Sequence, residues 1–151
     1  MLMNYLDTHP NATLRFHKSD MQLHIDTDAA YLVAPESKTR VAGSYYLSKS
    51  YSTIPPIPKP PINAPIHIEY HLLKHVVSSA AEGETAGIFH NFTTTLTIKH
   101  MLDALEHVQH AIPIKTDNST ATLFSNSTLK EKRSKLWNMR LHWIKDRVIQ
   151  N

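Results

Sequence analysis

The chain has 151 residues, enough for one domain with a proper core. Hydrophobic residues make up 41% and charged residues 19%, which is typical of a globular rather than a disordered protein. The absence of cysteine excludes disulfides, thiol catalysis and thiolate metal sites. No apolar run is long enough to span a bilayer and the start, MLMNYLDTHP, does not resemble a secretory signal, so we expect an intracellular protein, cytoplasmic or nuclear. The formal net charge of +3 permits a polyanionic partner without demanding one.

The first half of the chain is predicted to be mainly strand. A short helix should end before Pro10, and ATLRFH at residues 12–17 has the composition of a strand. Alternation of apolar and polar residues predicts a strand at residues 21–33, and two more are expected at residues 40–50 and 66–77. The residues expected to share one face are Leu23, Ile25 and Thr27 in the first of these strands, and Ile66, Ile68, Tyr70 and Leu72 in the third.

The second half is predicted to be mainly helical. Residues 54–65 are rich in proline and should form an irregular insert. Ser79 and Glu82 have the spacing of a capping box, which predicts the start of a helix. One apolar stripe follows, and a second begins at Ile98 and is broken before Pro113, so two helices are expected. The two stripes consist of Ala81, Glu84, Ile88 and Phe92, and of Ile98, Met101, Leu102, Leu105 and Val108.

A short strand at residues 112–116 and a last helix after the basic stretch 129–135 complete the pattern. Three consecutive strands, two helices, another strand and more helix favour an α/β fold. We therefore predict a mixed sheet flanked by helices, in which three antiparallel strands are followed by a helical crossover to a fourth strand.

Three acidic residues occupy positions that favour a metal site. Asp28 and Asp117 each follow a threonine in a predicted strand, and Glu84 lies one turn into the first major helix, on the face expected to pack on the sheet. A buried carboxylate is costly unless it is paired or binds a cation. Three converging oxygen ligands suit Mg²⁺ or Mn²⁺, and two such ions about 4 Å apart can hydrolyse a phosphodiester.

A purely structural interpretation of the acids stays open at this point. A single aspartate at a strand end is more often a turn or capping residue than a ligand. Glu82 fits the capping box, and Asp26 fits a solvated strand position.

Five segments of the chain, in order, carry a more specific signal. They are THPNATLRFHKSDM, DTDAAYLVAPESKTRVAGSYYLS, SSAAEGETAGIF, IKTDNSTA and KRSKLWNMRLHWIKDR. Together they resemble the ribonuclease H domain of copia-type retrotransposon Pol polyproteins, the region that follows the reverse transcriptase. The resemblance covers nearly the whole chain.

The resemblance implies a ribonuclease H fold, with a five-stranded mixed sheet flanked by helices. It also implies cleavage of the RNA strand of RNA–DNA hybrids with Mg²⁺ or Mn²⁺ as cofactor. Matched by position, Asp28 is the first-strand acid, Glu84 the helix acid and Asp117 the fourth-strand acid. These three residues would be both the catalytic and the metal-binding residues.

Departures from the family pattern lead us to expect impaired activity. Residues 1–20 would be a connecting segment after a lost reverse transcriptase, and residues 21–151 an incomplete domain. The family's fifth strand and fourth metal-site acid are not found before Asn151, and Asn138 stands where an aspartate is usual. Three acids should still bind metal, but more weakly and with a poorly held second ion. The alternative is a non-catalytic retroelement remnant, at most a weak nucleic-acid or protein binding module.

Basic and histidine residues suggest further partners. A basic set near the C-terminus suits phosphate contacts along a hybrid, although a solvated helix surface explains it as well. An open edge of the fourth strand would permit self-association. Three histidines at four-residue spacing, His67, His71 and His75, would suit zinc only on a helix, and a strand is expected there. The residues expected to bind nucleic acid are Lys130, Lys132, Arg133, Lys135 and Arg140.

Overall fold

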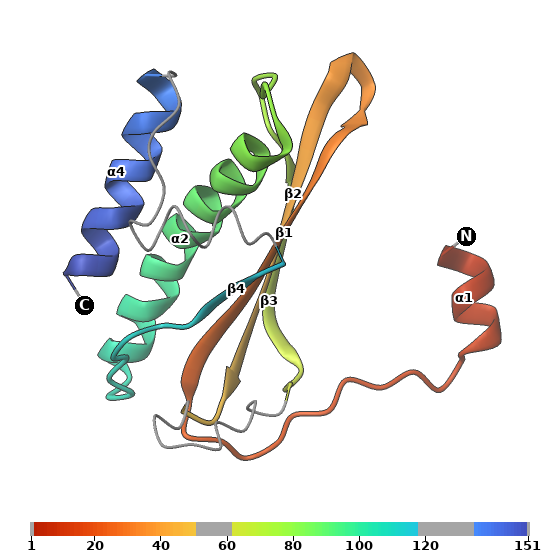
Figure 1. Cartoon of the computed structure of the whole chain (residues 1–151). Coiled ribbons are helices and arrows are strands. Elements are labelled where there is room, and N and C mark those ends of the chain that lie inside the picture. The colour runs from red at the N-terminus through yellow and green to blue at the C-terminus, as the bar shows by residue number, and fades with distance from the viewer. Residues whose placement is uncertain (1, 51–61, 118–134, 151) are drawn as a thin grey trace.

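A computed structural model describes residues 2–50, 62–117 and 135–150 (Figure 1). Three consecutive strands are followed by a long helix, a fourth strand and a last helix, the order expected from the sequence. The elements, in chain order, are α1 (Leu2–Thr8), β1 (Gln22–Ala34), the short 3₁₀ helix η1 (Pro35–Ser37), β2 (Lys38–Ser48), β3 (Pro65–Leu72), α2 (Ala80–Ala104), β4 (Ile114–Thr116) and α4 (Lys135–Ile149).

The four strands form one mixed sheet in the order β3-β2-β1-β4. β1 pairs with β2, and β2 with β3, in antiparallel fashion, whereas β4 is parallel to β1. Helix α2 provides the crossover that a parallel pair requires. The predicted fold class is confirmed, and the arrangement is consistent with a ribonuclease H-like fold.

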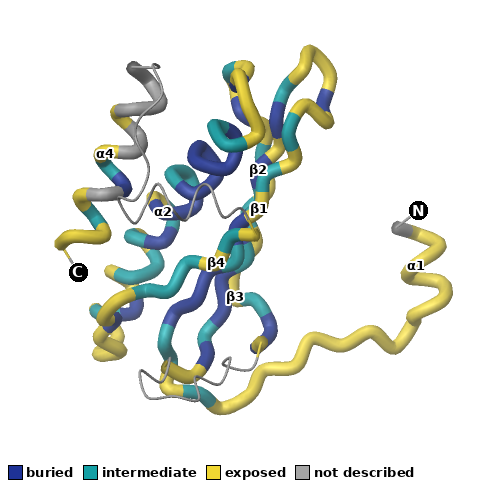
Figure 2. Tube along the Cα trace, viewed as in Figure 1, coloured by how far each residue is buried: buried dark blue, intermediate teal, exposed yellow. Residues whose placement is uncertain are grey.

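Helix α2 covers one face of the sheet, and α4 packs on the outer side of α2 (Figure 1). The buried residues gather where α2 meets β1 and β2, as Figure 2 shows. At one end of this layer Leu23, Ile25 and Tyr45 pack with Leu102 of α2. The predicted face of β1 is therefore confirmed as its core face, because Thr27 is buried there as well.

Helix α2 begins as the capping-box spacing predicts. The Ser79 hydroxyl accepts a hydrogen bond from the Glu82 amide at 3.2 Å, and the Glu82 carboxylate accepts one from the Ser78 amide at 2.8 Å. These bonds satisfy amides that have no partner inside the helix. None of the described helices, α2 included, is long and apolar enough to cross a membrane.

The prediction of two successive helices was wrong, because α2 is continuous from Ala80 to Ala104. Of the second predicted stripe, Leu102 is buried and Ile98 packs against the core. The remaining residues of that stripe are exposed, and two of them lie beyond the end of the helix: Met101, Leu105 and Val108. Only Ile98 and Leu102 of this stripe therefore contribute to the core.

The apolar stripe of β3 lies on the opposite face from the core. Its residues do share one face, but this face carries no helix in the described part of the chain: Ile66, Ile68, Tyr70 and Leu72 are 44, 66, 61 and 42% exposed. The register with β2 decides this, because His67 and His71 stand opposite the core residues Tyr45 and Val41. A polar set therefore faces α2, where Glu69 accepts hydrogen bonds from the Tyr45 and Thr94 hydroxyls at 3.1 and 2.7 Å.

Two predicted segments at the margins of the sheet differ from expectation. Residues 12–17 form no strand, and all the residues from 3 to 18 are exposed. Of the proline-rich stretch, residues 54–61 lie outside the described part of the chain, and Pro65 already begins β3.

A buried amide fixes the distance between α2 and the sheet. Asn91 is 1% exposed, and its Nδ2 donates to the Thr27 hydroxyl at 2.5 Å and to the Ala42 carbonyl at 2.8 Å. A Cβ atom at Gly43 would lie 2.7 Å from Asn91 Oδ1. Glycine at position 43 therefore lets the helix approach closely enough to bond to both β1 and β2.

Replacing Gly43 by alanine should push Asn91 out of this position. We expect Gly43→Ala to lower the free energy of unfolding by about 1–3 kcal/mol, the usual cost of overpacking a core, as measured by chemical denaturation. Ser44→Ala, on the neighbouring residue of the same strand, should change it by less than about 0.5 kcal/mol. Equal stability of the two variants would contradict this account of Gly43.

Candidate metal centre

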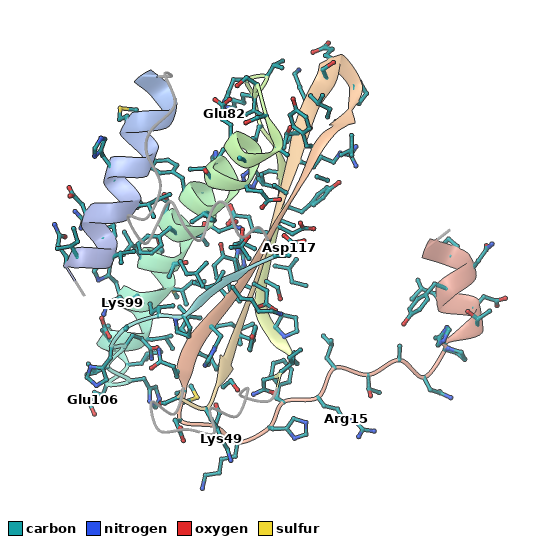
Figure 3. The ribbon with its side chains drawn as sticks, viewed as in Figure 1. Arg15, Lys49, Glu82, Lys99, Glu106 and Asp117 are labelled. Atoms are coloured by element: carbon teal, nitrogen blue, oxygen red, sulfur yellow. The ribbon has the colours of Figure 1, made fainter. Side chains whose placement is uncertain are left out.

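Parallel pairing of β4 with β1 brings two aspartates together. Thr116 stands opposite Thr27 in this pairing, so the residues that follow them, Asp117 and Asp28, come side by side where β4 ends. Figure 3 shows Asp117 at this point, in front of the crossing strands. Both aspartates are exposed. The repeated Thr-Asp pattern in the sequence thus corresponds to two neighbouring positions in space.

Close packing of α2 on β1 adds the third carboxylate. Gly87 lies one turn after Glu84, and a Cβ atom there would come within 3.3 Å of Val41 and 3.7 Å of Ala29. This contact holds Glu84 against β1 beyond the last residue that pairs with β4. The Ala29 amide is available at this point of the strand and donates a hydrogen bond to the Glu84 carboxylate.

The three carboxylates converge on one point. Asp28, Glu84 and Asp117 each offer an oxygen, and these oxygens all lie within 4.8 Å of one another. Glu84 is only 7% exposed, and its Oε2 atom is buried with no hydrogen-bond partner. The three acids selected from the sequence are therefore brought together.

Burial raises the pKa of the Glu84 carboxyl group. Removal from water is the main cause, and the negative charges of Asp117 and then Asp28 add to it. Together they raise the pKa of Glu84 from its ordinary value of 4.5 to about 7, although the Ala29 amide acts in the opposite direction. The cluster is thus unfavourable as three free anions.

A divalent cation relieves both problems, so the residues fit a metal ion. It would supply a partner for the buried Glu84 oxygen and would offset the repulsion between the three carboxylates. Three carboxylate oxygens suit hard cations such as Mg²⁺, Mn²⁺ or Ca²⁺. Among the described residues this is the one group of three or more His, Cys, Asp and Glu side chains with such spacing, and the histidines of β3 do not form another.

Basic and aromatic residues beside the acids were missed in the sequence. A hollow of about 170 Å³ on the open face of the sheet is lined by Asp28, Arg40 and Tyr70, among others. Arg40 Nη1 donates to the Tyr70 hydroxyl at 2.6 Å. Lys115 is exposed on β4, with its Nζ 3.8 Å from the Asp26 carboxylate. Nothing in the local pattern marks these residues, because they approach Asp28 only through strand pairing.

The predicted nucleic-acid-binding residues cannot be placed in the same way. Lys130, Lys132 and Arg133 lie outside the described residues. Lys135 and Arg140 belong to α4, and their side chains are also outside the described set. Helix α4 contacts α2 through Ile144 and Trp143, which pack with Ile88 and Phe89.

No family model matches the chain, and neither a curated protein nor a solved structure is significantly similar to it.

The raised pKa of Glu84 makes stability depend on pH when no metal is bound. A carboxyl that binds its proton more tightly in the folded state stabilises that state fully below pH 4.5, and this stabilisation is lost as the pH rises through about 7. We expect a loss of about 3 kcal/mol across this window, from 1.36 kcal/mol per pKa unit. Urea unfolding in chelator should show it, and Glu84→Gln should remove it. An identical pH profile for the variant would disprove the assignment.

Binding of a divalent ion should stabilise the fold through the same three residues. At a hundredfold excess of Mn²⁺ over its Kd, the expected gain is about 2.7 kcal/mol, which thermal unfolding can detect. Asp28→Asn and Asp117→Asn should each reduce this gain. Asp26→Asn, on the same strand but outside the cluster, is the matched control and should retain it. Equal gains in all four proteins would place the ion elsewhere.

Proposed function

We propose that the chain is a ribonuclease H-type domain, related to those of copia-type retrotransposons, that hydrolyses the RNA strand of RNA–DNA hybrids. The observation that carries the proposal is the convergence of Asp28, Glu84 and Asp117 around the unpartnered Glu84 oxygen. The order of the motifs in the sequence supports the same conclusion.

Each acid has a distinct role in this proposal. Asp28 and Asp117 are exposed, so they would hold Mg²⁺ or Mn²⁺ at the surface, within reach of a phosphodiester. Glu84 would hold the ion from the buried side, because α2 and β1 hold its side chain in place. Its carboxyl group would have to release its proton when the ion binds. When bound, the ion would polarise a water molecule and neutralise charge that develops on the phosphate.

The surroundings of the acids suit a nucleic-acid backbone. Arg40 and Lys115 lie near Asp28 and Asp117, on β2 and β4, and can contact the phosphates on either side of the cleaved bond. The basic set around α4 would extend these contacts along the hybrid: Lys130, Lys132, Arg133, Lys135 and Arg140. Binding of this kind weakens steeply with salt.

A non-catalytic binding module is the second candidate. The described part of the chain contributes three acids to the cluster, which is enough for one divalent ion. A second ion, needed to stabilise the leaving oxygen, would have few charged ligands of its own. The protein would then bind hybrid or metal without cleaving.

A cleavage assay separates the two candidates. With a labelled RNA–DNA hybrid and Mg²⁺ or Mn²⁺, we expect cuts in the RNA strand and at least about a hundredfold loss of rate in Asp117→Asn, the usual scale for loss of a group that stabilises the transition state. Asp26→Asn should keep most of the rate. If unaltered protein and Asp117→Asn give the same background, hydrolysis is refuted, and hybrid binding measured in the same samples tests the binding module.

A further inference from the structure

The outer edge of β3 has hydrogen-bonding groups without a partner strand. The Leu73 amide donates to Thr39 of the β2 side at 2.9 Å, and every second residue of a strand points the same way. His67 and Glu69 therefore face β2, whereas the amides and carbonyls of Ile66 and Ile68 face outward. Within the described residues β3 pairs with β2 alone. An edge of eight residues with exposed apolar side chains favours addition of a strand.

One segment of the chain is already attached at the start of this edge. The Ala64 amide donates to the Arg15 carbonyl at 3.1 Å. Asn63, just before it, accepts from the His17 amide at 2.8 Å and donates to the His17 carbonyl at 3.0 Å. Asn63 is 8% exposed and also donates to the Leu47 carbonyl at 2.8 Å, so this clamp is tied to the end of β2.

The residues before the clamp have the composition of a strand but no strand partner. Leu14 and Phe16 are 71 and 63% exposed, and Arg15 lies on the extended arm that leaves the sheet in Figure 3. Residues 12–17 contain no glycine or proline. Pro10, which lacks an amide hydrogen, would end such a strand two residues earlier.

We propose that residues 11–17 pair with the outer edge of β3 in the same molecule, as an additional antiparallel strand. The existing contact would set the direction and the register: Arg15 lies beside Ala64, so Thr13 would stand opposite Ile66 and Asn11 opposite Ile68. The pairing would cover the outward amides of Ile66 and Ile68.

The clamp favours the same chain over a second copy. A segment held beside its target by a short linker has an effective concentration of about millimolar, well above an ordinary protein concentration. The pairing requires no contact with Asp28, Glu84 or Asp117, so it stands independently of the proposed function.

Hydrogen exchange at single amides tests the pairing. The Arg15 carbonyl faces Ala64, so by alternation the Thr13 amide faces β3 too, and Thr13→Pro removes it. Measured by NMR on the whole chain, the Ile66 and Ile68 amides should exchange at least about tenfold faster in Thr13→Pro than in the unaltered protein. His67 and Glu69, which face β2, should not change, and Thr13→Val should behave as the unaltered protein.

Three results would overturn the proposal. The first is equally fast exchange of Ile66 and Ile68 in Thr13→Pro and in the unaltered protein. The second is an equal change at all four amides, which reports overall stability rather than pairing at the edge. The third is protection that grows with protein concentration together with a dimer in light scattering, which assigns the edge to a second copy.

Discussion

The burial of one carboxylate beside two others is the constraint on which the rest of this structure depends. Glu84 is nearly inaccessible, lacks a partner for one oxygen and lies within 4.8 Å of two aspartate oxygens. Such an arrangement costs folding free energy when no cation is present, and its raised pKa is the sign of that cost. A fold tolerates it only where the surrounding packing is strong enough to hold the group in place.

That packing comes from the contact between α2 and the first two strands. Two glycines, Gly43 on β2 and Gly87 on α2, remove the side chains that would keep the layers apart. Asn91 then bonds to both strands from the helix, one of its bonds going to Thr27, next to Asp28. Helix α2, which carries Glu84, and β1, which carries Asp28, are thus held together at two places. One is Gly87, close to Glu84, and the other is Asn91, further along the helix.

The two faces of the sheet differ in a way that the hydrophobic pattern does not show. The face under α2 takes polar side chains from β3, among them Glu69, which accepts hydrogen bonds from Tyr45 and Thr94. The other face leaves Ile68 and Tyr70 exposed, next to the hollow that contains Asp28 and Arg40. Exposed apolar and basic groups therefore lie beside Asp28 on the face of the sheet opposite α2.

By itself the sequence determined the features that depend on near neighbours along the chain. The capping of α2 by Ser79 and Glu82, the alternation in β1 and the identity of the three acids could all be predicted, because turn chemistry and periodicity act over a few residues. Only the tertiary structure decided which face of β3 is buried, that α2 is continuous, and that Arg40 and Lys115 flank the acids. These features depend on strand register and on how α2 packs on the sheet, and both arise from contacts between segments far apart in the chain.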